Sequence, residues 1–91
     1  MRLSLNGVPT LADLAAGESA VLTRLDLPEA DAQRLMELGF LPGSVIVAAR
    51  SAPGGDPRVY RVEGTEFALR GDTARRMRVS AVASGGEADG R

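Results

Sequence analysis

The 91-residue chain contains no cysteine, no histidine, no lysine and no tryptophan. Without cysteine there is neither a disulfide nor a thiolate nucleophile, and without histidine the commonest metal ligand and the commonest general base are missing. A metal ion would have to be held by carboxylate and carbonyl oxygens, which suit Mg²⁺ or Ca²⁺ better than ferrous iron or zinc. The sequence therefore predicts no cofactor and no tight transition-metal site, and leaves open only weak binding of a divalent cation.

Catalytic signatures are also missing. The acidic residues near predicted turns have no spacing typical of an acid/base pair or a carboxylate metal site; they are Asp56, Glu63, Glu66 and Asp72. The chain has no nucleophile motif, and its glycines stand at turn positions rather than in a phosphate-cradling loop. We therefore expect that the protein is not an enzyme.

Charge, aromatic content and hydropathy further narrow the class of protein to which the chain can belong. The formal net charge of -1 and a pI near 5.3 argue against a dedicated nucleic-acid-binding protein. Aromatic residues make up 3% of the chain, so the core must be built from aliphatic side chains. No apolar run approaches the ~20 residues that cross a bilayer, and residues 1–6 lack the hydrophobic region of a signal peptide. These features predict one cytoplasmic domain that does not insert into a membrane.

Short strands dominate the pattern that is present. Alternating apolar residues between Gly, Pro and Asp predict strands at 18–25, 44–50, 58–63, 66–70 and 77–82. The pattern predicts a mainly β fold, a small β-barrel of about five strands with one main helix and one or two short helical turns.

The main helix is expected to begin within residues 26–29, where Pro28 and two acidic residues favour a helix start. Its apolar stripe of Ala32, Leu35 and Met36, with Leu38 beside it, should cover one opening of the barrel. Short helical turns are predicted after Thr10, where Asp13 completes a capping box, and again within residues 71–76.

A short connection with two glycines and a proline is predicted to join the main helix to the next strand. Gly39 suits the left-handed conformation that ends many helices, and Pro42 follows at a distance that prevents the helix from continuing. Pro42-Gly43 suits a type II turn, in which the third residue needs positive φ. An apolar strand is then predicted from Val45 onward.

The ordered motifs resemble the FeoA family of bacterial ferrous-iron uptake proteins. The run Leu-Met-Glu-Leu-Gly-Phe-Leu-Pro-Gly-Ser-Val-Ile-Val at 35–47 carries most of the resemblance, with residues 60–64 and 67–70 following it. The match extends to 11–18 upstream and 74–79 downstream, so it covers most of the chain. The resemblance implies an SH3-like barrel and a non-catalytic regulator that docks on the cytoplasmic GTPase region of the FeoB transporter of ferrous iron.

The resemblance and the strand pattern together assign residues 1–82 to one FeoA-like, SH3-like barrel domain. Residues 83–91 are poor in large apolar groups, and we expect them to form a disordered tail. Whether the domain forms a homo-oligomer, and whether it activates or inhibits the transporter, stays open.

A partner-contact surface is predicted from position and expected exposure. Its residues are Phe40, Leu41, Pro42, Asp56, Tyr60, Arg70 and Arg75. Large apolar residues mostly lie inside, so Phe40 and Leu41 are either docking anchors or core residues. On this hypothesis, truncating Phe40 or Arg70 to alanine weakens transporter binding and leaves the fold intact.

The arginines between residues 70 and 78 have two interpretations. They either bind phosphate or an acidic partner, or they lie on the solvated face of a strand, and alternation about Met77 and Val79 favours solvent for Arg76 and Arg78.

Two alternative functions remain. The first is a metal-responsive domain similar to the C-terminal SH3-like domain of iron-dependent repressors of the diphtheria-toxin-repressor type. The second is a small nucleic-acid-binding barrel that uses the arginines between residues 70 and 78, and it predicts salt-sensitive binding.

Overall fold

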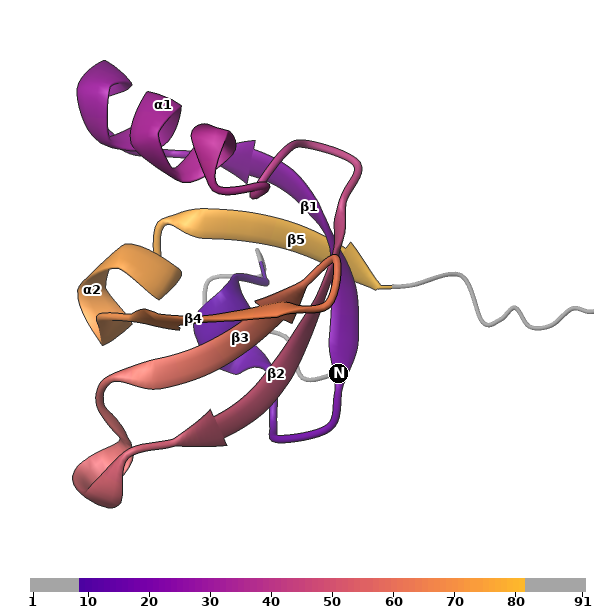
Figure 1. Cartoon of the computed structure of the whole chain (residues 1–91), viewed down its shortest axis with the longest axis vertical. Coiled ribbons are helices and arrows are strands. Elements are labelled where there is room, and N and C mark those ends of the chain that lie inside the picture. The colour runs from indigo at the N-terminus through magenta and orange to yellow at the C-terminus, as the bar shows by residue number, and fades with distance from the viewer. Residues whose placement is uncertain (1–8, 82–91) are drawn as a thin grey trace, which may run out of the picture.

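The computed structural model describes residues 9–81, and it contains one five-stranded antiparallel sheet in the order β4-β3-β2-β1-β5 (Figure 1). In chain order the elements are η1 (Leu11–Asp13), β1 (Ser19–Leu25), α1 (Glu29–Glu37), β2 (Val45–Ser51), η2 (Pro53–Gly55), β3 (Arg58–Val62), β4 (Thr65–Leu69), α2 (Gly71–Ala74) and β5 (Met77–Ala81). The predicted mainly β fold class is confirmed. The sheet curls but does not close, because the outer strands β4 and β5 do not pair with each other.

Alternation along the strands builds the core, as the sequence predicts. Ala20 and Leu22 of β1 are buried, while Thr23 of the same strand is exposed. The buried set that lines the inside of the sheet also includes Ile46, Ala48, Tyr60, Val62, Leu69, Met77 and Val79. Register shifts in the β1–β5 and β2–β3 pairs raise the local twist, and this twist bends five short strands around one core.

The connection from α1 to β2 has the predicted geometry. Gly39 has a φ of 113°, and the N–H groups of Gly39 and Phe40 donate to the carbonyls of Met36 and Leu35 at 3.0 and 3.1 Å. This pair of bonds is a Schellman motif. The N–H of Ser44 then donates to the carbonyl of Leu41 at 2.8 Å, across a Pro-Gly pair with positive φ at the glycine, as a type II turn requires.

Helix α1 lies beside one end of the curled sheet (Figure 1). Leu35 is its buried residue, Ala32 and Met36 are half-buried, and Leu38 at its C-terminal cap is exposed. The predicted stripe therefore packs on the core mainly through the C-terminal half of the helix. None of the helices within residues 9–81 has the length and apolar character needed to span a bilayer.

The segment around η1 joins two parts of the sheet that do not pair directly. Thr10 forms a bridge with Arg78 of β5, and the hydroxyl of Tyr60 in β3 donates to the carbonyl of Leu11 at 3.0 Å. The N–H of Thr10 donates to the carboxylate of Asp13 at 2.8 Å, which is the acidic half of the predicted capping box. The predicted tail at 83–91 lies outside the described residues, so the domain limits stay a prediction.

Candidate partner-contact surface

Two of the seven predicted contact residues belong to the core. Phe40 and Tyr60 are both 0% exposed, and the Phe40 ring packs edge-on against Phe67 with centroids 5.4 Å apart. Truncating a buried phenylalanine costs about 3–5 kcal/mol, so the expectation that Phe40→Ala leaves the fold intact does not hold. A partner could reach neither side chain without opening the domain.

The environment of Tyr60 is consistent with a structural role. Burial raises the pKa of the Tyr60 phenol, and the nearby Arg58 guanidinium opposes part of that rise. The hydroxyl is already committed to the carbonyl of Leu11. Tyr60 thus fastens the η1 segment to β3 and offers no group to a partner.

Exposed apolar side chains gather instead around the connection between α1 and β2. Leu38, Leu41 and Val45 are 45%, 44% and 49% exposed, and they are the large exposed apolar residues within residues 9–81. Pro42 is exposed between them. We call these four residues the junction patch.

The remaining predicted residues meet at the start of α2. The N–H of Gly71 donates to the carboxylate of Asp56 at 2.9 Å, and a Cβ added at Gly71 would lie 3.3 Å from the Arg75 guanidinium. Arg75 also forms an ion pair with Asp72. Arg70 is exposed, and it has no ion pair within the described part of the chain. Asp56, Arg70 and Arg75 form a second surface, the α2 patch.

The two patches lie at opposite ends of β2. This strand runs from the α1 connection to the η2 loop, and its seven residues span about 20 Å. Figure 1 shows the α1 connection and the η2 loop at different ends of the sheet. The structure therefore brings Asp56 and Arg75 together but does not bring them next to Leu41 and Pro42.

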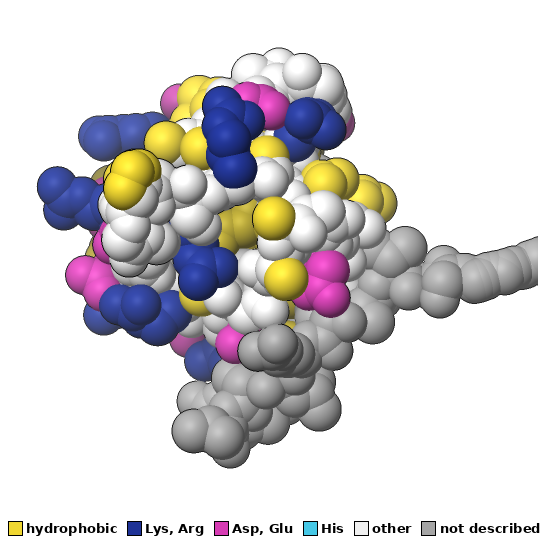
Figure 2. All heavy atoms as spheres, turned by 90° about the horizontal axis from the view of Figure 1, so that it is seen from below, with side chains coloured by type: hydrophobic (Ala, Val, Ile, Leu, Met, Phe, Trp, Pro, Cys, Tyr) yellow, Lys and Arg dark blue, Asp and Glu magenta, His cyan; other side chains and the backbone are white. Residues whose placement is uncertain are grey.

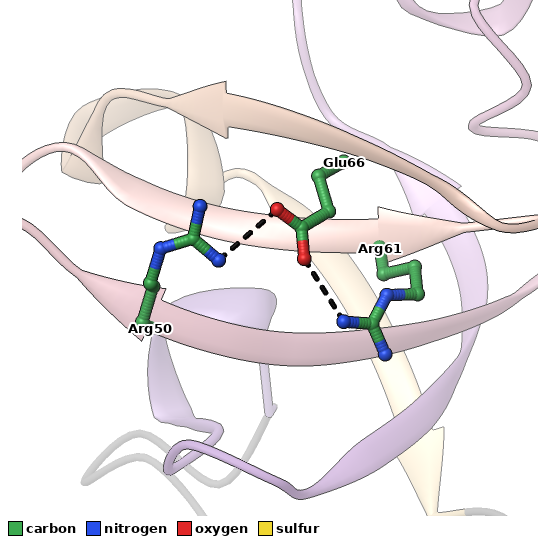
Figure 3. A network of polar contacts seen from close by, with 3 residues as sticks. All are labelled: Arg50, Arg61 and Glu66. Carbon is green, nitrogen blue, oxygen red and sulfur yellow. Dashed lines mark hydrogen bonds and ion pairs between the residues drawn. The ribbon is translucent and has the colours of Figure 1, made fainter.

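A polar network that sequence reasoning missed crosses β2, β3 and β4 (Figure 3). The carboxylate of Glu66 accepts from Arg50 at 3.0 Å and from Arg61 at 2.9 Å. Hydrogen bonds from Arg61 and then from Arg50 lower the pKa of Glu66. The hairpin register, which pairs Arg61 with Glu66, was the available signal for half of this network.

Beside this network lies an open cleft of about 420 Å³. One wall is the segment at 12–16, which begins within η1, and the other is formed by the end of β2 and the start of β3. In the view of Figure 2, a hollow with apolar side chains at its floor opens between arginine side chains. No sequence motif marks the cleft, because its two walls are 30 or more residues apart.

The remaining charged groups do not assemble a metal site. Within residues 9–81 there is no cluster of three or more carboxylates that could hold an ion.

On β5, Met77 and Val79 are buried, as alternation predicts, and the Arg78 guanidinium pairs with the Asp26 carboxylate at 3.1 Å.

In a comparison with protein families, the model described as "FeoA domain" matches residues 10–81. A curated relative, the Fe(2+) transport protein A/Fe(2+) transporter FeoB fusion protein of Porphyromonas gingivalis, is 31% identical over 74 residues. The alignment covers 81% of this chain and 9% of the fusion protein, so the chain corresponds to a small part of that relative.

Solved structures agree with the family match. The FeoA protein of Chlorobium tepidum has a TM-score of 0.78 at 30% identity, over 91% of this chain and 80% of that one. Iron(II) transport protein A of Clostridium thermocellum has a TM-score of 0.76 at 31% identity, over 82% and 46%. FeoA of Stenotrophomonas maltophilia, solved with zinc and described as an SH3 domain protein, has a TM-score of 0.67 at 38% identity, over 79% and 89%.

Proposed function

Since the chain belongs to the FeoA family of ferrous-iron transport, we propose that it is a non-catalytic accessory protein that docks on the cytoplasmic GTPase region of a FeoB-type transporter. The fusion protein of Porphyromonas gingivalis is the observation that carries this proposal, because its name joins transport protein A and FeoB in one polypeptide. Covalent linkage of two binding modules replaces a bimolecular encounter with an intramolecular one at about millimolar effective concentration. Such a linkage favours parts that work in contact.

The chemistry of the chain supports an accessory role. The sequence offers no histidine, cysteine or lysine to act as base or nucleophile. The buried hydroxyl of Tyr60 donates to the carbonyl of Leu11 and so holds the η1 segment in place. Iron handling and GTP hydrolysis are therefore assigned to the transporter, and this chain acts where the GTPase region lies, in the cytoplasm.

The junction patch is the surface that we propose for docking. Exposed leucine and valine side chains grouped on one connection are typical of a protein contact. The Schellman motif and the type II turn fix the backbone on both sides of Leu41, so little conformational entropy is lost when a partner binds. Arg70, at the distant α2 patch, can add charge complementarity if the partner extends along the sheet.

Calorimetric titration of this chain against the isolated GTPase domain and against the detergent-solubilised transporter, each with and without guanine nucleotide, tests the proposal. We expect saturable binding that Leu41→Ser weakens by about tenfold or more, since a buried apolar anchor is worth 1.4 kcal/mol or more. Ala68→Ser, at an exposed position on β4, is the matched control and should bind like the unchanged chain. Absence of binding to either form of the transporter would reject docking, and equal affinity of the two variants would reject the junction patch.

The structure gives less support to the two alternative functions. Arg75 and Arg78 are paired with carboxylates, which reduces the positive charge that a nucleic acid would need. A metal-responsive switch has no carboxylate cluster to use within residues 9–81, although the Stenotrophomonas maltophilia relative was solved with zinc.

A further inference from the structure

The cleft between the 12–16 segment and the β2–β3 strands has the size of a ligand site. Its volume of about 420 Å³ falls in the range of about 300–1,000 Å³ that is typical of such sites. The cleft is partly open to solvent, and Figure 2 shows a hollow with an apolar floor between arginine side chains on the face seen from below. An open trough of this kind suits an extended chain better than an enclosed small molecule.

Small side chains make the cleft accessible to a main chain. Ala12, Ala15 and Ala16 line one wall and Ala48 lies on the other, so four methyl groups border part of the hollow. Ala15 and Ala16 are exposed. A segment with small or medium apolar side chains can lie against these methyl groups and remove them from water.

The charge of the cleft is predominantly positive. Two arginines, Arg50 and Arg58, line it, and Asp13 is the single acidic residue among the lining residues. The Asp13 carboxylate already accepts the N–H of Thr10 at 2.8 Å. Arg58 is half-buried and has no carboxylate partner within residues 9–81, so its charge is unmatched in the protein as described.

Both guanidinium groups are held in place by other parts of the protein. Arg50 is bound by Glu66, which Arg61 holds from the other side (Figure 3). Arg58 donates to the carbonyl of Leu14 at 3.3 Å. Each of these contacts uses only part of the five N–H donors of a guanidinium, so further donors remain for a carboxylate, and little ordering is needed on binding.

We propose that this cleft binds an extended, acidic segment of a partner protein. Carboxylates of the segment bond to Arg50 and Arg58, while its intervening apolar side chains lie on the alanine wall. Charge complementarity selects an acidic ligand, and the apolar border together with the open shape selects a peptide over inorganic phosphate. The site is distinct from the junction patch and does not depend on which protein supplies the segment.

The ¹H–¹⁵N spectrum of the full chain, titrated to millimolar concentrations of an acetylated eight-residue peptide that alternates glutamate with alanine, tests this site. We expect shifts at the amides of Ala15, Ala16, Ser51 and Val59, and no comparable shifts with the peptide that alternates glutamine with alanine. Arg58→Gln and Arg50→Gln should each weaken binding by about tenfold or more, since each removes a hydrogen bond between charged groups. Arg34→Gln, at an exposed arginine of α1, is the matched control and should not change affinity.

Three results would overturn the inference. The first is the absence of shifts around the cleft with the glutamate peptide, and the second is equal binding of the glutamine peptide. The third is a titration with inorganic phosphate alone that gives the same shifts and the same dependence on Arg58. Because Arg50 is largely exposed, Arg50→Gln should keep the fold even if Arg58→Gln does not, and unchanged affinity in a folded Arg50→Gln protein would count against the site.

Discussion

Phe40→Ala should unfold this domain at a much lower denaturant concentration than the unchanged protein. The Phe40 ring is fully buried, it packs edge-on against Phe67, and it lies directly after the Schellman motif of α1. Replacing a buried phenylalanine by alanine costs about 3–5 kcal/mol. A domain of this size has a free energy of unfolding of about 5–15 kcal/mol, so the variant would lose a large share of it.

Urea denaturation followed by far-ultraviolet circular dichroism measures this loss directly. With a slope of about 2 kcal/mol per molar urea, a loss of about 4 kcal/mol lowers the midpoint by about 2 M. Leu41→Ala is the matched control, because Leu41 is the next residue along and is 44% exposed. It should change the free energy of unfolding by about 0.5 kcal/mol or less. Equal midpoints for the two variants would show that Phe40 is not a core residue and would refute the assignment of the junction patch to its exposed neighbours.

Four further predictions concern the backbone and the polar contacts. Gly39→Ala should lower stability by about 1–2 kcal/mol in thermal unfolding, because alanine is strained at a φ of 113° while its Cβ meets only an ordinary contact. Tyr60→Phe should cost about 0.5–1.5 kcal/mol, because it removes one hydrogen bond to the carbonyl of Leu11, which still accepts the N–H of Leu14. The phenol of Tyr60 should titrate above its ordinary pKa, as ultraviolet absorbance would show, so its contribution to stability is complete below that ordinary pKa and is lost as the pH rises through the folded pKa. In a carbon-detected NMR titration, the carboxyl of Glu66 should have a depressed pKa that rises toward its ordinary value in Arg61→Gln.

Each of these has an outcome that would count against its basis. A Gly39→Ala protein as stable as the original would mean that the end of α1 is not closed as described. A Tyr60 phenol that titrates at its ordinary pKa would be inconsistent with burial. An unchanged pKa of Glu66 in Arg61→Gln would contradict the contact between Arg61 and Glu66 shown in Figure 3.

The local chain geometry was predictable because single residues determine it. The φ values of 113° at Gly39 and 97° at Gly43 lie in a region that glycine adopts readily and other residues rarely do, and the ring of Pro42 fixes its own φ. Strand alternation placed Leu22 and Val79 inside the sheet for a similarly local reason.

Contacts between distant segments could not be predicted from the same patterns. The cleft and the link from Arg50 to Glu66 depend on how β2 pairs with β3, and that register shifts between Ala48 and Arg50. A single extra residue in a strand changes which side chains face each other, and no motif signals it. The burial of Phe40 beside the exposed Leu41 is equally a result of tertiary packing, since both are large apolar residues on one turn.

The most direct test of the central claim is an NMR footprint of the transporter on this chain. ¹⁵N-labelled chain is mixed with the unlabelled cytoplasmic GTPase domain of a FeoB-type transporter at equal concentration. We predict that the amide signals of Leu38, Leu41, Gly43 and Val45 shift or broaden, while signals from the exposed face of α1 stay unchanged. Spectra without any change, or changes confined to residues away from the connection between α1 and β2, would contradict docking through the junction patch.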